Sequence, residues 1–341
     1  TGRSYRVGRV CGFLEMKLAS LKTGDRDGIL VVVNRELTKA KLVPHIALTM
    51  QAALDNWNEV EPELQEAYKL LNESKGEFIP FDPCKVAAPL PRAYQWLDGS
   101  AYLSHVERVR KARGSVMPEN LYSDPLMYQG ASDNMLGAND SIEAGSADWG
   151  IDFEAEVGVV TDDVPYGVSV NEAAAHIKLI VLINDVSLRN LIPDELAKGF
   201  GFLHGKPASA FSPVAVTPDE LGVAWENSKL HLPLNVTWNG QLVGKANAGD
   251  DMQFSFAQLI HHAAKTRKLA AGTIIGSGTV SNVDSTKGYS CIVEKRVVEI
   301  IETGSAMTEY LRYGDKIRIE MLDGQGHSIF GAIEQQVKPC Q

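Results

Sequence analysis

The fold class is decided by two stretches, DFEAEVGVV at residues 152–160 and HIKLIVLIND at residues 176–185. Both are short and rich in β-branched and apolar residues, which predicts strands within a sheet. Further strand candidates are SPVAVT, LHLPLNVTW with QLVGKAN, CIVEKRVVEII, and DKIRIEMLDGQGHSIFGAIEQQV. Helical spacing is clear only at residues 47–71 and 254–270. Because helices are few and do not alternate with strands, a β-dominated α+β fold is favoured over a doubly wound sheet or a TIM barrel.

The chain divides into a small first part and a larger second part. Residues 16–34 read as a hairpin around TGDRDG, and residues 47–71 as one or two helices interrupted near Pro62. Prolines then cluster between residues 80 and 91, which breaks regular structure and places a domain boundary near residues 75–90. We therefore expect a small N-terminal α+β domain at 16–85 and a second domain at 86–341. Residues 1–15 are interpreted as an upstream extension or a cloning scar.

Composition excludes several classes of protein. The 341 residues are 44% hydrophobic and 22% charged, and the formal net charge of −10 argues against a nucleic-acid or anionic-membrane binder. The longest apolar runs have five residues, too short for a membrane span. Four cysteines lack CxxC spacing, which favours free thiols in the cytoplasm over a zinc site or a disulfide framework.

Three carboxylates stand where acidic side chains are uncommon. Glu154 and Glu156 lie two residues apart and share one face of a strand, and Asp185 ends an apolar strand. From the residues alone, the pair can be a solvated acidic face. Asp185 can be a helix cap that pairs with Arg189 four residues later. The alternative is a site for Mg²⁺, Ca²⁺ or Mn²⁺, because these cations prefer carboxylate oxygens and zinc does not.

The motifs occur in an order that resembles the fumarylacetoacetate hydrolase (fumarylacetoacetase) family, in its bacterial type. The order is Asp followed by His, then ExE, ND-x-S-x-R, GK and GSGT. The resemblance covers about Met16 to Val337 and is densest from Trp96 to Glu294. It implies a mixed β-sandwich roll of the fumarylacetoacetase C-terminal type for the second domain, which would bind the metal and carry the catalytic groups.

The resemblance also implies roles for ten residues. The metal ligands would be four carboxylates: Asp98, Glu154, Glu156 and Asp185. The catalytic groups would be the general base His105, its orienting partner Glu294, and the cations Arg189 and Lys206. The substrate contacts would be Tyr128 and Thr279. His105 lies in SAYLSHVERVRKARG, which reads as a short charged helix and would act as a lid over the metal.

The implied activity is metal-dependent hydrolysis of a carbon–carbon bond in a 1,3-diketone acid. The most specific expectation is fumarylacetoacetate to fumarate and acetoacetate, within tyrosine and homogentisate degradation. Mg²⁺ or Ca²⁺ is the expected cofactor, with Mn²⁺ possible and no organic cofactor. The expected partners are a small diketo acid and a second copy of the chain, in a cytoplasmic homodimer that contacts neither nucleic acid nor membrane.

Some residues depart from the family pattern. The hydrolases carry a Gln and a Tyr soon after the Arg, and both are missing from NLIPDELAKGFGF at residues 190–202. An Arg expected after the His has only Arg110 or Arg113 as counterparts. The His-x-x-Glu pattern of the acylpyruvase and decarboxylase branch is off by one at Glu107, which favours the hydrolase branch. An acylpyruvate hydrolase, a 2-oxo-acid hydratase, an oxaloacetate decarboxylase and a non-catalytic protein with a structural calcium site stay as alternatives.

Overall fold

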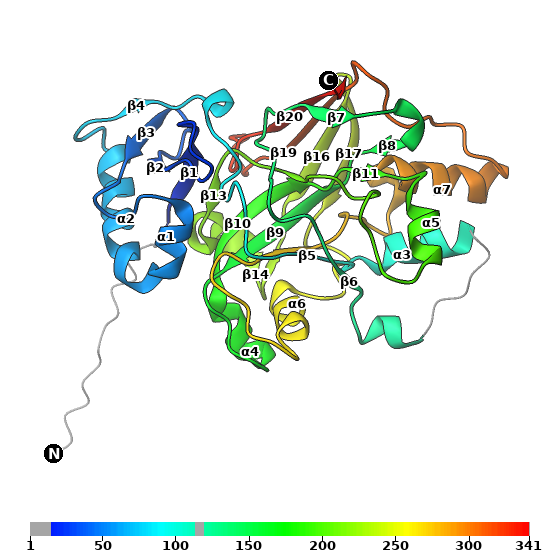
Figure 1. Ribbon diagram of the computed structural model, residues 1–341, viewed down its shortest axis with the longest axis horizontal. Coiled ribbons are helices and arrows are strands. Elements are labelled where there is room, and N and C mark those ends of the chain that lie inside the picture. The colour runs from blue at the N-terminus through cyan, green and yellow to red at the C-terminus, as the bar shows by residue number, and fades with distance from the viewer. Residues whose placement is uncertain (1–14, 113–118, 341) are drawn as a thin grey trace.

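The structure is a computed structural model that describes residues 15–112 and 119–340. Two sheets face each other, and seven helices of the described chain lie around them (Figure 1). This arrangement confirms the predicted β-dominated α+β class with a small N-terminal α+β unit. The interpretation of residues 1–15 as an extension falls, except for residue 15, outside the described residues. No helix within the described ranges is both long and apolar enough to cross a membrane.

The larger sheet has eleven strands and runs from the N-terminal unit through the centre of the molecule. Its order is β4 (Ile79–Pro80), β3 (Lys39–Leu42), β2 (Ile29–Val33), β1 (Lys17–Leu21), β13 (Ala215–Val216), β10 (Ile177–Asn184), β9 (Ala155–Thr161), β18 (Ile274–Gly276), β5 (Trp96–Gly99) and β6 (Met127–Gln129), with β12 (Ala210–Phe211) beside β10. The antiparallel pair β1–β13 joins the N-terminal strands to the central ones. The proposed boundary at residues 85 and 86 stays a prediction.

The second sheet has five strands and covers one face of the first. Its order is β17 (Gln241–Asn247), β16 (Pro233–Trp238), β19 (Lys316–Met321), β20 (Ile333–Pro339) and β7 (Ile142–Ala144). Two short pairs complete the strands: β8 (Ile151–Asp152) with β11 (Ser187–Leu188), and β14 (Trp225–Glu226) with β15 (Lys229–Leu230). Strands β9 and β10 contact β16, β19 and β20. Every residue of β9 is buried, because other elements cover both faces of this central strand.

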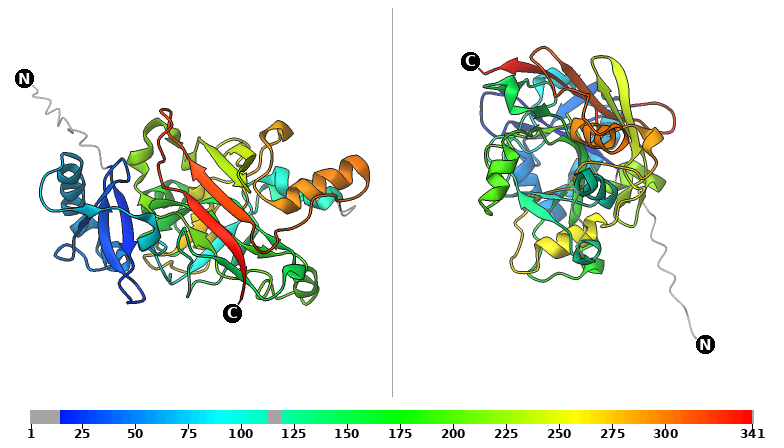
Figure 2. Two further views of the ribbon diagram at one scale, coloured as in Figure 1. Left: turned by 90° about the horizontal axis from the view of Figure 1, so that it is seen from above. Right: turned by 90° about the vertical axis from the view of Figure 1, so that its right-hand side faces the viewer.

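The helices occupy three regions of the molecule (Figures 1 and 2). Helices α1 (Met50–Asp55) and α2 (Trp57–Asn72) pack on the N-terminal strands, and α4 (Val170–Ala173) packs against α6 (Phe256–Ala263). Helices α3 (Leu103–Ala112) and α7 (Ile292–Thr303) lie side by side at the end opposite the N-terminal unit, near α5 (Ile192–Ala197). This last region adjoins the candidate site.

The prediction of a strand at CIVEKRVVEII was wrong, because residues 292–303 form helix α7. The β-branched residues favoured a strand, but the helix begins with help from a distant residue. Asp152 accepts hydrogen bonds from the backbone N–H groups of Ile292 (2.7 Å) and Val293 (2.9 Å), while Cys291 at the N-cap provides no side-chain bond. Local sequence cannot show such a cap.

The helical region at residues 47–71 is interrupted at a different residue from the one predicted. The break lies at Asn56, between α1 and α2, and Pro62 is inside α2. Pro62 is the sixth residue of α2, so its missing N–H removes only one hydrogen bond near the helix start. The helix predicted at 254–270 is also shorter than expected, covering Phe256–Ala263 with a capping box from Ser255.

Candidate metal centre and active site

Seven of the ten predicted site residues line one cavity of about 210 Å³. They are Asp98, His105, Tyr128, Glu154, Arg189, Lys206 and Thr279. The other three contact or closely approach these seven from behind the lining. Larger hollows exist, such as one of about 920 Å³ beside Lys17 and Glu220, but the clustered carboxylates lie at the smaller cavity.

Three carboxylates meet beneath this cavity because neighbouring strands carry them to one place. Asp98 lies on β5, Glu156 on β9, and Asp185 directly after β10, and these strands are joined through β18 and the β9–β10 pair. One oxygen from each of the three side chains lies within 4.8 Å of the others. All three are at most 5% exposed. A strand end and two strand interiors therefore bring three acidic groups together away from water.

This arrangement is unfavourable for three ionised carboxylates alone. Burial, and then the charge of Asp185, raises the pKa of Asp98 well above its usual value. Burial, and then the charges of Asp98 and Asp185, raises the pKa of Glu156 in the same way. Both side-chain oxygens of Glu156 are buried without a hydrogen-bond partner. Unpartnered buried carboxylate oxygens are tolerated only when the group is protonated or a cation compensates its charge.

Asp98, Glu156 and Asp185 fit a hard divalent cation. Their ligand atoms are carboxylate oxygens, which Mg²⁺, Ca²⁺ and Mn²⁺ prefer. Glu154 and Asp152, which pair with Lys206 and Arg189, bring the formal negative charges to five against two positive charges. A divalent cation would lower this excess of three negative charges to one. The orphaned oxygens of Glu156 supply the free ligand positions that such a cation requires.

Glu154 stands apart from this cluster, although the sequence grouped it with the metal ligands. Its Oε1 accepts hydrogen bonds from Ser187 Oγ (2.9 Å) and Lys206 Nζ (3.1 Å) and lies 2.6 Å from Arg189 Nη2 in an ion pair. Its Oε2 accepts from Thr279 Oγ1 (2.5 Å). Burial would raise its pKa, but Arg189 and Lys206 outweigh burial and lower it well below the usual value. Among the described residues, Oε2 accepts from Thr279 alone and keeps a lone pair that is available to a metal, whereas Oε1 is occupied.

The two predicted cations are buried and fixed by acidic partners. Lys206 Nζ lies 2.6 Å from Asp185 Oδ2. Burial would lower the pKa of Lys206, but Asp185 and Glu154 raise it, so the side chain is cationic. Arg189 Nε donates to Asp152 Oδ2 at 2.8 Å. Arg189 therefore does not form the local pair with Asp185 that the four-residue spacing suggested, because the chain there forms the short strand β11 and not a helix.

His105 contacts Glu294 across the α3–α7 interface, at a distance of 2.7 Å between Nδ1 and Oε2. The other oxygen of Glu294 accepts from Arg108 Nη1 (2.5 Å) and Ser281 Oγ (3.0 Å). Burial alone would raise the pKa of Glu294, but the hydrogen bond and charge of His105 and the charge of Arg108 lower it. An ionised Glu294 holds the imidazole with Nδ1 protonated, which leaves Nε2 free to accept a proton.

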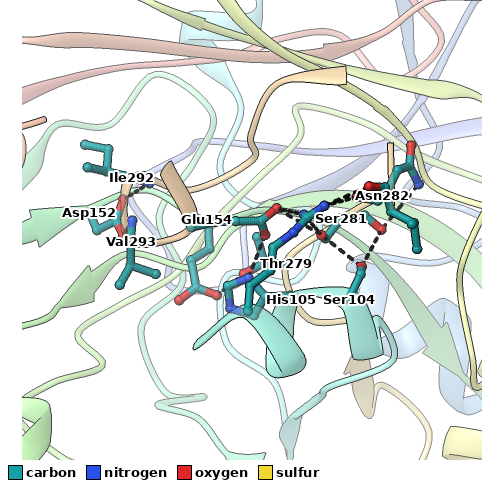
Figure 3. Close-up of polar contacts among 12 residues, drawn as sticks. Ser104, His105, Asp152, Glu154, Thr279, Ser281, Asn282, Ile292 and Val293 are labelled. Atoms are coloured by element: carbon teal, nitrogen blue, oxygen red, sulfur yellow. Dashed lines mark hydrogen bonds and ion pairs between the residues drawn. The ribbon is translucent and has the colours of Figure 1, made fainter. Parts of the chain in front are cut away.

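The local backbone explains why Glu294 reaches His105. Asp152 caps the start of α7, as Figure 3 shows for Ile292 and Val293, and this places Glu294 in the first helical turn. On the opposite side, Ser104 Oγ donates to Ser281 Oγ at 3.0 Å and ties α3 to the segment before α7. The base and its partner therefore depend on contacts between segments far apart in sequence.

Tyr128 and Thr279, the predicted substrate contacts, are engaged with carboxylates. The Tyr128 hydroxyl donates to Asp185 Oδ2 at 2.5 Å, and Lys206 Nζ lies 5.2 Å from the centre of its ring. Beside Thr279, the Gly278 N–H donates to Asp98 Oδ1 at 3.0 Å. Gly278 has φ +75°, and a Cβ there would lie 2.2 Å from the Gly99 carbonyl oxygen, so a glycine is required.

Three residues that contact the predicted site residues were not predicted from the sequence. Arg108 pairs with Glu294 and lies three residues after His105, so helical spacing could have found it in place of Arg110. Arg113 lies outside the described residues. Ser209 Oγ donates to Asp185 Oδ1 at 2.7 Å, and Asp152 pairs with Arg189, but no local signal marks either residue. The segment 190–202, which lacks the Gln and Tyr of the family pattern, supplies apolar residues to the cavity instead.

Two family models match the chain. The model described as "Fumarylacetoacetate (FAA) hydrolase C-terminal" matches residues 95–338, and "Fumarylacetoacetase N-terminal domain 2" matches residues 16–92. The first model alone covers more than half of the chain, and it includes all ten predicted site residues.

Two curated relatives have enzymatic names. A 2,4-didehydro-3-deoxy-L-rhamnonate hydrolase of Sphingomonas sp. strain SKA58 is 29% identical over 206 residues, 57% of this chain and 69% of the relative. The oxaloacetate tautomerase YisK of Bacillus subtilis strain 168 is 24% identical over 289 residues, 84% of this chain and 86% of the relative. The matches therefore include a hydrolase and a tautomerase.

Solved structures share the fold. The fumarylacetoacetate hydrolase EaFAH from Exiguobacterium antarcticum has a TM-score of 0.66 at 18% identity, covering 95% of this chain and 100% of that one. A fumarylpyruvate hydrolase from Pseudomonas aeruginosa, solved with Mn²⁺ and pyruvate, has a TM-score of 0.53 at 12% identity, covering 73% of this chain and 91% of that one.

Proposed function

We propose that this chain, which belongs to the fumarylacetoacetate hydrolase family, is a metal-dependent enzyme that hydrolyses a carbon–carbon bond in a 1,3-diketone acid. The most specific form of the proposal is fumarylacetoacetate to fumarate and acetoacetate. One observation carries it. A histidine oriented by a buried carboxylate lines the same cavity as Asp98, which belongs to the carboxylate cluster.

His105 has the contacts that a general base needs. It would take a proton from a water molecule whose oxygen bonds to a carbonyl carbon of the diketone. The adjacent carbon–carbon bond then breaks, its electron pair forms the enolate of the leaving ketone, and that carbon is finally protonated. Glu294 fixes the Nδ1–H tautomer and balances the charge of the imidazolium that forms. General-base catalysis contributes a factor of about 10²–10⁴.

The cavity also stabilises negative charge on the reacting oxygens. Lys206 and Arg189 supply fixed positive charge, and a well-aimed donor of this kind contributes about 2.7–4 kcal/mol to transition-state stabilisation. Asp98, Glu156 and Asp185, with Glu154 as a fourth ligand, would hold the divalent cation. When bound, that cation supplies Lewis-acid stabilisation of the enolate oxygen. Mg²⁺ and Ca²⁺ are our first candidates. Mn²⁺ is supported by its presence in the Pseudomonas fumarylpyruvate hydrolase.

A tautomerase is the second candidate. The relative named oxaloacetate tautomerase aligns with 84% of the chain, more than the hydrolase relative does. A base beside a buried carboxylate cluster can also move a proton next to a carbonyl group without cleaving a bond. Acylpyruvates and oxaloacetate therefore belong in the substrate panel, which also covers the hydratase and decarboxylase alternatives.

The test is turnover with and without metal. We expect the protein with Mg²⁺ or Mn²⁺ to cleave at least one 1,3-diketone acid, and His105→Ala to lower kcat by about 10²–10⁴. His176→Ala is the matched control, because His176 Nδ1 also lies 2.6 Å from a carboxylate, that of Asp162, but His176 does not line the cavity. Full turnover by His105→Ala would contradict the role of the base. Metal-dependent stability without turnover of any substrate would favour a structural calcium site.

Several broader expectations extend this proposal. We propose a homodimer located in the cytoplasm, with a place in tyrosine and homogentisate degradation if fumarylacetoacetate is the substrate. We also propose that α3, which carries His105, moves as a lid when substrate binds. Size-exclusion chromatography with light scattering tests the first of these, and hydrogen exchange of α3 with and without substrate tests the last.

A further inference from the structure

A second set of metal-binding side chains lies where α3 meets α7. It consists of His105 on α3, with Cys291 and Glu294 at the start of α7. An imidazole nitrogen, the thiol sulfur and a carboxylate oxygen all lie within 4.8 Å of one another. We call these three residues the α3–α7 triad. Its nitrogen and sulfur atoms distinguish it from the carboxylate cluster, which offers oxygen atoms alone.

The start of α7 does not use the Cys291 thiol. Cys291 is the N-cap residue and Glu294 is the third residue of the helix, two positions whose side chains face each other in a capping box. The thiol makes no capping hydrogen bond. Asp152 instead accepts from the N–H groups of Ile292 and Val293. Cys291 is fully buried and forms no disulfide, so its sulfur is available as a ligand.

The protons of the triad decide how a metal can bind. Arg108 Nη1 binds one oxygen of Glu294, and the other oxygen, Oε2, lies 2.7 Å from His105 Nδ1. Burial, and then the charge of Asp152, raises the pKa of Cys291 well above its usual value, so the thiol is protonated. A metal that binds here must displace this proton, because the thiolate and not the thiol is the metal ligand.

The mixture of nitrogen, sulfur and oxygen ligands selects the metal. Zn²⁺ and other thiophilic divalent cations bind such a set, whereas Mg²⁺ and Ca²⁺ prefer oxygen. Zinc bonds of about 2.0–2.3 Å in a tetrahedron put the ligand atoms about 3.3–3.6 Å apart. The triad atoms reach that spacing by small movements, in which His105 Nδ1 and Glu294 Oε2 separate by about 0.6 Å. Three protein ligands leave the fourth position to water.

A metal on Nδ1 changes what the other nitrogen of His105 can do. Nδ1 binds a metal through its lone pair, so a neutral imidazole then carries its proton on Nε2. With the proton there, Nε2 can only donate a hydrogen bond, and it cannot take a proton from water. In total one proton leaves the thiol, and the imidazole proton moves from Nδ1 to Nε2. The metal-bound triad therefore lacks the general base.

We propose that the α3–α7 triad is an inhibitory site for Zn²⁺ and other thiophilic divalent cations. Binding rests on the geometry of the triad, whereas inhibition rests on the proposed function, because it acts through His105. His105 lines the cavity and its side chain is 20% exposed, so the ion reaches the triad from the cavity. The enzyme then needs a hard cation at the carboxylate cluster and is blocked by a thiophilic cation at the triad.

The first experiment measures binding without turnover. The parent protein is the full chain at saturating Mg²⁺ with Cys11→Ser, Cys84→Ser and Cys340→Ser, so that Cys291 is the remaining cysteine. Titration with Cd²⁺ should give an ultraviolet thiolate-to-metal charge-transfer band that saturates at one Cd²⁺ per chain. Adding Cys291→Ser should abolish the band, and Cys291→Ala repeats the test should that variant fold poorly. A parent protein without the band would overturn the site.

Two histidine variants of the parent protein separate a three-ligand site from a single reactive thiol. His105→Ala should weaken Cd²⁺ binding by at least about tenfold. His176→Ala is the matched control, because His176 Nδ1 also lies 2.6 Å from a carboxylate, that of Asp162, but His176 is not part of the triad. It should keep the parent affinity. Equal Cd²⁺ affinities of the two variants would overturn the triad as a metal site.

The second experiment measures inhibition by Zn²⁺ at saturating Mg²⁺, with each protein compared with its own zinc-free turnover of a 1,3-diketone acid. Adding Cys291→Ser to the parent protein should raise the half-inhibitory Zn²⁺ concentration by at least about tenfold. Equal values in the two proteins, or full relief by further Mg²⁺, would place the zinc at the carboxylate cluster and overturn the inference while leaving diketone hydrolysis intact. Absence of turnover in the parent protein would count against the proposed function, and the Cd²⁺ titration would still decide the site.

Discussion

Replacing Glu294 by glutamine tests the catalytic pair with little change in shape. Both carboxylate oxygens of Glu294 accept hydrogen bonds, Oε2 near His105 Nδ1 at 2.7 Å and Oε1 from Arg108 and Ser281. A carboxamide has only one acceptor oxygen. If that oxygen faces Arg108, the amide N–H₂ forces the proton of His105 onto Nε2, and the base is lost. If the oxygen faces His105, the amide and the guanidinium of Arg108 are two buried donors in contact.

Either arrangement carries a large penalty. Glu294 is 2% exposed, so water cannot repair the mismatch. We expect kcat of Glu294→Gln to fall by about 10²–10⁴, the usual contribution of a general base. The unpaired donors should also lower the free energy of unfolding by about 1–3 kcal/mol. KM should change little, because Glu294 does not line the cavity.

The assay is steady-state turnover of the best 1,3-diketone acid substrate at saturating metal, with urea unfolding in parallel. Glu299→Gln is the control, because Glu299 is on the same helix, is 4% exposed and accepts hydrogen bonds from Thr308 and Met307 outside the cavity. It should lose stability and keep kcat. A Glu294→Gln protein with kcat within about threefold of wild type would refute the assignment of His105 as a base held by Glu294.

Three further predictions concern the metal centre, the end of α7 and the turn beside Asp98. Glu156→Gln should raise the melting temperature of the metal-free protein at neutral pH, because burial and neighbouring charges raise the pKa of Glu156 and make its ionised form destabilising. The same variant should lose the stabilisation that Mg²⁺ gives the wild type, about 2.7 kcal/mol at 100 times Kd. A thermal shift with Mg²⁺ as large as that of wild type would count against Glu156 as a metal ligand. Glu299→Gln should lower stability at pH 7 by about 1–3 kcal/mol. Although burial would raise the pKa of Glu299, its hydrogen bonds lower that pKa to about 2. The stabilisation by ionised Glu299 is therefore present above pH 4.5 and is lost as the pH falls toward 2. Urea midpoints of wild type and variant that differ equally at pH 7 and pH 2 would argue otherwise. Gly278→Ala should destabilise the protein by about 1–3 kcal/mol. Gly326→Ala should cost less, because its added Cβ meets nothing within 4 Å. Chemical denaturation that ranks the two variants in the reverse order would contradict the close approach of Gly278 to Gly99.

Much of the central sheet could be predicted because its signals are local. The apolar runs that became β9 and β10 are short. Asn239 and Gly240, which connect β16 and β17, both have positive φ, and Asn-Gly is the dipeptide that such a hairpin turn favours. Glu154, Glu156 and Asp185 were found because acidic residues in apolar strands are conspicuous. The family resemblance supplied Asp98 and the histidine pair.

The features that escaped prediction depend on distant contacts. Helix α7 starts on a cap from Asp152, about 140 residues earlier, so the strand-like residues after Cys291 were misleading. The separation of Glu154 from the carboxylate cluster follows from Arg189 and Lys206, which approach from different segments. The sequence showed that two expected polar residues are missing from residues 190–202, but only the fold shows that Ile192, Leu196 and Phe202 line the cavity.

The most direct measurement of the central claim is turnover of a 1,3-diketone acid by protein stripped of metal and then reloaded, with the products quantified. The account predicts loss of cleavage on stripping, and its return with Mg²⁺ or Mn²⁺ in wild-type protein but not in Glu156→Gln. Undiminished cleavage by the stripped protein, or equal recovery in Glu156→Gln, would contradict a metal centre built on Asp98, Glu156 and Asp185.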